Sequence, residues 1–146
     1  MKRQEKYPDT EFFKFYNANE KNKIGGDCVI RAVALATGQT WEQTVREMTE
    51  MGIKKGLVLN DKNLYPKYLE SKGFIQMSEP RDIYDNTKLS VVRFIKSKLN
   101  TRTDKVIVVA NVGSHHVVCI KDNKVHDIWN SSLQTMHKYW IKKVVE

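Results

Sequence analysis

Apolar residues recur at helical spacing through the first two thirds of the chain. The first such run carries its apolar residues at Val29, Ala32, Val33 and Ala36. Spacings of three and four residues place them on one side of a helix, predicted from Cys28 to about Thr37. Gly38 follows as a stop, because glycine readily adopts the left-handed conformation that ends many helices.

The same spacing predicts three more helices. Thr40-Trp41-Glu42-Gln43 matches a capping box and starts the second helix. Its inward residues are Trp41, Val45 and Met48. The third follows Asn60-Asp61, ends at Gly73 and carries Leu64, Tyr65, Tyr68 and Leu69. The fourth is predicted from Thr87 to Leu99, with Leu89, Val92, Ile95 and Leu99 on one side.

After residue 104 the pattern changes to short β-branched runs. These predict strands at residues 105–112, 116–120 and 125–129, and a fourth at 139–145. Lys121-Asp122-Asn123-Lys124 is the kind of polar turn that closes a hairpin between the second and third strands. An aromatic cluster at residues 12–16 predicts one short strand in the polar N-terminal arm.

Helices followed by antiparallel strands predict an α+β domain. The 146 residues suit a single domain, residues 1–146, with an arm at 1–27, a mainly helical part at 28–100 and a mainly β part at 105–146. The first helix would start at the cysteine and pack with the others on a C-terminal sheet. The chain contains neither a G-x-G-x-x-G fingerprint nor a Walker A sequence, which argues against nucleotide enzymes of those types.

Composition limits the class of protein, the compartment and the partners that we expect. A hydrophobic fraction of 40% indicates a globular chain, and no apolar stretch is long enough to cross a membrane. The polar start is not that of a secretory signal, so we expect a cytoplasmic protein. The net charge of +8 permits nucleic-acid binding, but the basic residues are scattered, which favours a solvated surface.

Cys28 is the first candidate for chemistry, because it follows Gly25-Gly26-Asp27 and begins the first predicted helix. Unpaired N–H groups and the helix dipole at that end favour a thiolate. Asp27 is a candidate N-cap whose charge opposes this effect. The alternative is a cysteine that only packs, and we expect that role for Cys119 in the second strand.

The predicted hairpin brings a carboxylate close to an imidazole. A turn near residues 122–123 pairs residues whose numbers sum to 244 or 245, so Asp127 lies opposite residue 117 or 118, within reach of His116. A carboxylate there fixes the tautomer of the ring and stabilises the imidazolium. His115 faces the opposite way and replaces His116 if the strand slips by one residue. His126 is predicted to point away from Asp127, and His137 to be isolated on the surface.

The order Cys, His, Asp on a helix-then-sheet chain resembles the papain-like cysteine peptidase superfamily. The resemblance rests on Gly-Asp-Cys-Val-Ile-Arg-Ala at residues 26–32 and His-Val-Val-Cys-Ile-Lys-Asp-Asn-Lys-Val-His-Asp-Ile-Trp-Asn-Ser-Ser at residues 116–132. Both look like segments of small bacteriophage and bacterial proteins placed in that superfamily. They are also similar to the leader-peptide peptidase domains of bacteriocin exporters. About a third of the chain is covered.

The resemblance implies a papain-like fold with nucleophile Cys28, base His116 and orienting residue Asp127. Asn130 is the alternative third member, because papain itself uses an asparagine there. Papain-like enzymes carry a glutamine shortly before the cysteine as an oxyanion donor, and residues 5–27 contain none. Asn22, six residues ahead of the cysteine, and Asn19 are the candidate replacements.

Three functions follow from these observations. The first is a cysteine hydrolase, most simply a peptidase acting on a peptide or a host protein without metal or cofactor. A zinc site from Cys28, His115, His116 and Cys119 lacks the usual ligand spacing. The second is a phage-encoded inhibitor or binding protein that keeps the fold without turnover. The third is a basic nucleic-acid-binding protein.

Overall fold

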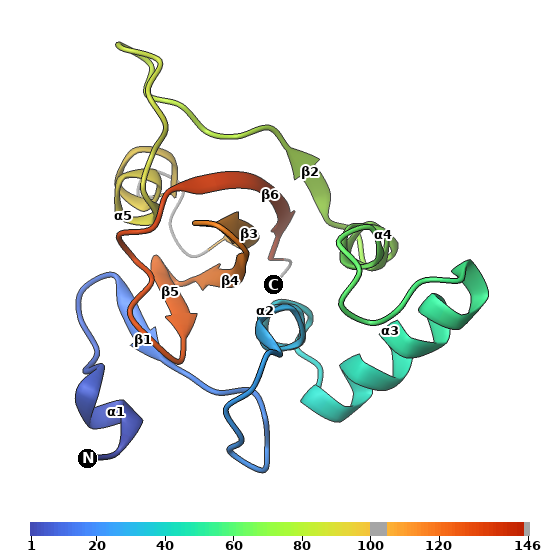
Figure 1. Cartoon of the computed structure of the whole chain (residues 1–146). Coiled ribbons are helices and arrows are strands. Elements are labelled where there is room, and N and C mark those ends of the chain that lie inside the picture. Colours follow the sequence, from blue (N-terminus) through green and yellow to red (C-terminus); the bar gives the residue numbers. More distant parts are fainter. Residues whose placement is uncertain (100–104, 145–146) are drawn as a thin grey trace.

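A six-stranded sheet runs through the centre of the molecule (Figure 1). The computed structural model describes residues 1–99 and 105–144, except for the side chains of residues 98 and 99. Its strands are β1 (Phe13–Phe15), β2 (Ile75–Met77), β3 (Val106–Val112), β4 (His116–Lys121), β5 (Lys124–Asp127) and β6 (Met136–Lys143). Its helices are α1 (Arg3–Lys6), α2 (Cys28–Thr37), α3 (Trp41–Lys55), α4 (Leu64–Ser71) and α5 (Val91–Phe94), which continues as a π-helical segment, η1 (Ile95–Leu99).

The strand order is β1-β5-β4-β3-β6-β2. The hairpin of β4 and β5 pairs Cys119 with His126 and Ile120 with Val125, so paired residue numbers sum to 245. This confirms one of the two predicted registers. Asp122 and Asn123 form the turn with φ of 53° and 60°, the left-handed conformation that a two-residue hairpin turn requires.

Helices cover both faces of the sheet. On one face α2 and α4 pack against Val109, Val117, Cys119 and Trp140. On the other face α5 and η1 pack against alternate residues of the same strands, including Val108, Ala110, Val118 and Ile120. Figure 1 shows α2, α3 and α4 on one side and α5 on the other. The mixed α+β class is therefore confirmed.

The sheet differs from the predicted one at both edges. The prediction was a purely C-terminal antiparallel sheet, but β1 joins one edge and β2 the other. β1 pairs with β5 in parallel, and β2 pairs with β6. The strand at residues 12–16 was foreseen, although its parallel partner was not. β2 was missed because it has only three residues, all of them exposed, and so short a run is no recognisable strand pattern.

The predicted bounds of α2 and the predicted start of α3 are correct. Gly38 ends α2 with φ of 71°, and the Thr40 hydroxyl accepts the Gln43 N–H at 3.0 Å at the start of α3. The Gln43 side chain bonds Glu47 instead of completing the capping box. α4 begins later than expected, at Leu64.

The helix predicted from Thr87 to Leu99 is shorter and turns a different face inward. Ser90 caps its start, and the side chain accepts the Arg93 N–H at 3.2 Å. The fully buried residues are Leu89, Val91, Phe94 and Ile95, whereas Val92 is only half-buried. The predicted inward face included Val92, but its neighbour Val91 is the residue that faces the core. The side chain of Leu99 lies outside the described residues.

Candidate active site

Cys28 is the first residue of α2, and its side chain is half-buried. A Cβ added at Gly25 or Gly26 would meet nothing within 4 Å, so the chain before the thiol leaves open space. Asp27 occupies the N-cap position, but its carboxylate caps no N–H of the helix. The predicted side-chain cap is therefore wrong. The carboxylate instead bonds Arg31, and it accepts the Trp41 indole N–H at 2.9 Å.

His116 and Asp127 meet at the end of the β4–β5 hairpin. The Nε2 atom of His116 lies 2.6 Å from Oδ2 of Asp127. Because Nε2 faces the carboxylate, Nδ1 is the ring nitrogen left for the thiol. The His116 ring also stacks at a tilt on the Trp129 ring, with centroids 4.9 Å apart. Trp129 thus covers one side of the imidazole.

The Asp127 carboxylate is buried and fully engaged by donors. Its Oδ1 accepts the backbone N–H of Ile128 at 2.8 Å and lies 3.6 Å from the Arg31 guanidinium. Its Oδ2 accepts the Ser131 hydroxyl at 2.7 Å in addition to the His116 ring. Buried charged groups are stable only when they are paired and hydrogen-bonded. These contacts hold the carboxylate in one orientation toward the imidazole.

The thiol and the imidazole shift each other's protonation. Burial alone would raise the pKa of Cys28, but hydrogen bonds from His116 and the Val117 N–H, with the positive charges of His116 and Arg31, lower it below its ordinary value. Burial likewise opposes the charged form of His116, yet hydrogen bonds to Asp127 and Cys28 raise its pKa to about 9. Both shifts favour a thiolate–imidazolium pair near neutral pH.

Arg31 is a functional candidate that the sequence reasoning passed over. Its side chain is 7% exposed and bonds Asp27 on one side and Asp127 on the other. It therefore connects the segment before Cys28 to the carboxylate behind His116. Two signals were available: Arg31 is the only charged residue in the apolar run 29–36, and it lies three residues after Cys28, on the same side of the helix.

The structure separates the alternatives for the histidine and the third member. His115 is exposed in the turn before β4, whereas His116 contacts Asp127. Asn130 is exposed, and its Oδ1 accepts the hydroxyl and backbone N–H of Ser132 at 2.6 and 3.1 Å. The geometry thus brings together Cys28, His116 and Asp127, whereas His115 is exposed and Asn130 bonds Ser132.

The two candidate oxyanion residues lie in the loop before α2. Oδ1 of Asn19 accepts the Lys21 N–H at 3.0 Å, and Oδ1 of Asn22 lies 3.4 Å from Nδ2 of Asn17. These bonds order the loop through the amide oxygens. The amide N–H groups of Asn19 and Asn22 are the atoms that an oxyanion would need, and their role stays a prediction.

The other histidines have separate partners. His126 Nδ1 lies 3.1 Å from the Lys124 carbonyl oxygen, and its ring meets the Tyr16 ring edge-on. His137 is not isolated, contrary to the prediction. Its Nδ1 lies 3.0 Å from Glu79 Oε1, and its Nε2 lies 2.8 Å from the Gly113 carbonyl oxygen. Within residues 1–99 and 105–144, no three metal-ligating side chains gather into a site.

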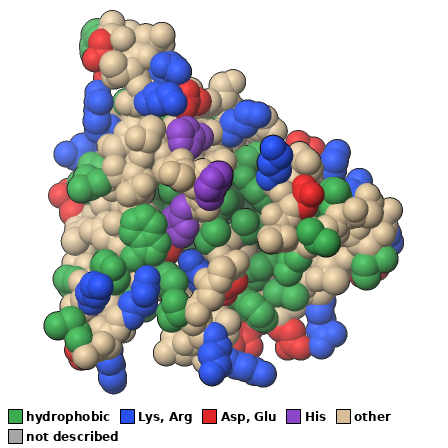
Figure 2. Space-filling view, in the orientation of Figure 1, with side chains coloured by type: hydrophobic (Ala, Val, Ile, Leu, Met, Phe, Trp, Pro, Cys, Tyr) green, Lys and Arg blue, Asp and Glu red, His purple; other side chains and the backbone are tan. Residues whose placement is uncertain are grey.

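The histidines gather on one face of the molecule, beside a hydrophobic patch (Figure 2). Among the described residues, no helix combines the length and apolar character needed to span a membrane. Comparisons with protein families, curated proteins and solved structures give no significant match to this chain. The chemistry of the site must therefore be argued from its own geometry.

Proposed function

We propose that this protein is a papain-like cysteine hydrolase, most simply a peptidase, with Cys28 as nucleophile. One observation carries the proposal: a half-buried thiol at a helix start interacts with an imidazole whose other nitrogen is held by a buried carboxylate. That arrangement generates a thiolate and a proton donor at the same place, which is what cleavage of an amide requires.

The first step is attack of the Cys28 thiolate on the carbonyl carbon of the substrate. The S–C bond forms, and the carbonyl oxygen takes the negative charge of a tetrahedral intermediate. His116 then donates its Nδ1 proton to the amide nitrogen as the C–N bond breaks. The amine leaves, and an acyl-thioester remains on Cys28.

The second step consumes water. Neutral His116 takes a proton from the water molecule as its oxygen attacks the thioester carbonyl carbon. The C–S bond breaks, a carboxylic acid leaves, and the thiolate–imidazolium pair is restored. Asp127 keeps Nε2 protonated throughout and stabilises the imidazolium. When the substrate is a glutamine side-chain amide, the same two steps release ammonia and consume water, which is deamidation. If an amine replaces water in the second step, the reaction is acyl transfer, as in transglutamination.

The direct test compares the two thiols of the same protein. A thiol-directed electrophile at neutral pH should modify Cys28 and leave Cys119 unmodified, as read by peptide mass spectrometry. Cys28→Ala should lower the hydrolysis of a peptide mixture by at least about 10⁴-fold. Cys119→Ala is the matched control and should retain both activity and labelling of Cys28. A Cys28 that reacts no faster than a free model thiol would overturn the proposal.

The same variant separates the two other functions. If Cys28→Ala keeps the biological effect of the native protein, a binding protein or inhibitor that works without turnover explains the molecule better. Salt-dependent retention of the native protein on DNA would favour the nucleic-acid function. We favour the hydrolase, because neither alternative requires an imidazole held between a thiol and a buried carboxylate.

A further inference from the structure

A cavity of about 500 Å³ lies between the N-terminal end of α4 and strands β2, β3 and β6. We call it the Tyr65 cavity. The lining residues used below are Lys62, Tyr65, Lys67, Asn111, Lys138 and Trp140. Clefts of this size take one or two amino-acid side chains.

Two walls of the Tyr65 cavity lead to the candidate nucleophile. Asn111 is paired with Val117 across β3 and β4, and the Val117 N–H is the one that hydrogen-bonds Cys28. On the α4 side, Tyr65 is near enough to Cys28 that thiolate charge adds to burial in raising the tyrosine pKa. A peptide whose carbonyl carbon meets the thiol can therefore place a neighbouring side chain in this cavity.

The charge of the cavity is positive and uncompensated. Three lysines line it against one carboxylate, Glu70. None of these lysines takes part in an ion pair among the described residues. Their ammonium groups are free to approach an anionic ligand, and lysine's long stem lets the charge reach it.

The cavity also offers neutral donors. The Trp140 ring forms part of the wall, but its Nε1 is fully buried and therefore makes no contact with a ligand in the cavity. The donors that a ligand can reach are side-chain amides. The amides of Asn111 and Gln76 lie in the same lining. Lysine and N–H donors together suit a ligand that carries oxygen acceptors and negative charge.

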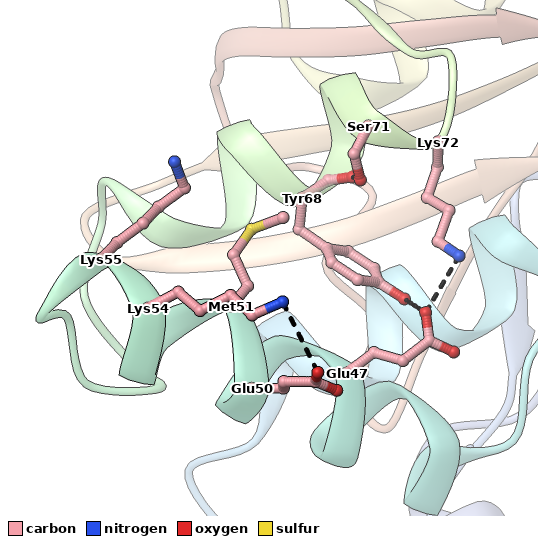
Figure 3. A pocket seen from close by; sticks show the side chains of 8 residues that line it. All are labelled: Glu47, Glu50, Met51, Lys54, Lys55, Tyr68, Ser71 and Lys72. Carbon is pink, nitrogen blue, oxygen red and sulfur yellow. Dashed lines mark hydrogen bonds and ion pairs between the residues drawn. The ribbon is translucent and has the colours of Figure 1, made fainter.

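A second hollow has a similar volume, about 480 Å³, but most of its lysines are paired with carboxylates of the protein. This Tyr68 groove lies between α3 and the C-terminal end of α4, and Figure 3 shows Lys54 and Lys72 each paired with a glutamate, while Lys55 points away from them. Its ion pairs are Lys72–Glu47 at 3.0 Å and Lys54–Glu50 at 3.7 Å. The Tyr68 hydroxyl donates to Glu47 at 2.9 Å. Among the described residues, two of the three lysines of the Tyr68 groove are paired with a carboxylate, whereas none of the three lysines of the Tyr65 cavity is.

We propose that the Tyr65 cavity is a substrate subsite that selects an aspartate or glutamate side chain within the two residues preceding the carbonyl attacked by Cys28. This inference rests on the proposed hydrolase function and names its substrate class. Unpaired Lys67 and Lys138 attract the carboxylate, and the N–H donors of the lining bind its oxygens.

The test uses peptides that carry an electrophile in place of the scissile bond. Two sets of three probes vary one of the two residues that precede the electrophile, and within each set that residue is Glu, Gln or Lys. The rate constant for modification of Cys28 is measured by mass spectrometry, with Cys119 as the internal reference. We expect the Glu probe to react about tenfold faster than the Gln probe and the Lys probe to be slowest.

A charge-reversed pair of variants identifies the cavity as the cause. Lys67→Glu combined with Lys138→Glu should abolish the preference for the Glu probe or invert it. Lys54→Glu combined with Lys55→Glu, in the Tyr68 groove, changes the net charge equally and should keep the preference. Thermal unfolding of each variant checks that it is folded.

The outcomes separate the two proposals. If Cys28 reacts faster than Cys119 but the Gln or Lys probe modifies Cys28 as fast as the Glu probe does, the subsite is wrong and the hydrolase function stands. If the preference for Glu persists after the charges of Lys67 and Lys138 are reversed, another part of the surface recognises the charge of the probe, and the subsite is again wrong. If no probe reacts faster with Cys28 than with Cys119, both proposals fail.

Discussion

The two cysteines of this chain lie in opposite electrostatic settings. Cys28 begins a helix at a half-buried position, where His116, the Val117 N–H and Arg31 lower its pKa against the effect of burial. Cys119 is fully buried in the middle of β4 among apolar side chains, and burial raises its pKa to about 12. The comparison shows that donors and charges around the sulfur, and not the residue type, separate a nucleophile from a packing group.

Removal of the imidazole should make Cys28 an ordinary buried thiol. His116→Ala takes away the hydrogen bond and the positive charge, so burial dominates and the pKa of Cys28 rises. We expect hydrolysis to fall by about 10³-fold or more. The rate of peptide hydrolysis measures the effect. His115→Ala, which changes the adjacent exposed histidine, should stay close to native activity, and equal losses in the two variants would contradict the assignment.

Asp127→Asn should reduce the difference between Cys28 and Cys119 indirectly, by acting through the imidazole of His116. The amide keeps a side chain of similar size beside Ser131 but loses the charge that stabilises the imidazolium. We expect a loss of about 10²-fold or more in hydrolysis, with folding retained in circular dichroism. Asn130→Ala is the control for the alternative third member. Activity that drops with Asn130→Ala and not with Asp127→Asn would reverse their roles.

The main effect of Arg31→Met should be a lower free energy of unfolding, and not a lower rate of hydrolysis. Asp27 and Asp127 would both lose the cation that they share in a buried setting, and a buried charge left without its partner destabilises a protein by about 3 kcal/mol. Urea unfolding measures the change in the free energy of unfolding. Arg46→Met removes an exposed ion pair with Glu42 and should leave that free energy close to the native value. Similar costs for both would mean that the Arg31 bridge contributes little.

The pH profile should show where the imidazolium is lost. His116 has a pKa of about 9, so hydrolysis should decline as pH rises through about 9. In Cys28→Ala the bond and charge of the thiolate are gone while Asp127 remains, and we expect the His116 pKa to fall below its native value. Ring-proton titration by nuclear magnetic resonance measures both forms. An unchanged His116 titration would show that the two groups are not coupled.

Cys119→Ala should give the smallest effect. It removes one sulfur atom from a packed region, and we expect a loss of about 1 kcal/mol in the free energy of unfolding. Labelling of Cys28 should keep its native rate, since Cys119 belongs to the interior of the sheet. A slower Cys28 reaction in this variant would indicate that the two settings communicate through β4.

Local sequence patterns gave much of the fold for identifiable reasons. The bounds of α2 followed from its apolar spacing and from Gly38, and the β4–β5 register followed from the two turn residues. These features depend on neighbours in the chain, so periodicity and turn chemistry report them directly. β2 could not be found in this way, because its backbone pairs with β6 while its side chains remain in solvent.

The same distinction between local pattern and tertiary packing applies to the candidate site. The sequence alone placed a thiol at a helix start and set an imidazole and a carboxylate on paired strands, since both follow from local geometry. Only the tertiary structure decided that α2 lies against β4, so that Cys28 meets His116, and that Arg31 bridges two carboxylates about 100 positions apart. Such contacts depend on packing between distant segments, which no local pattern specifies, and the low dielectric around them gives the thiol its altered pKa.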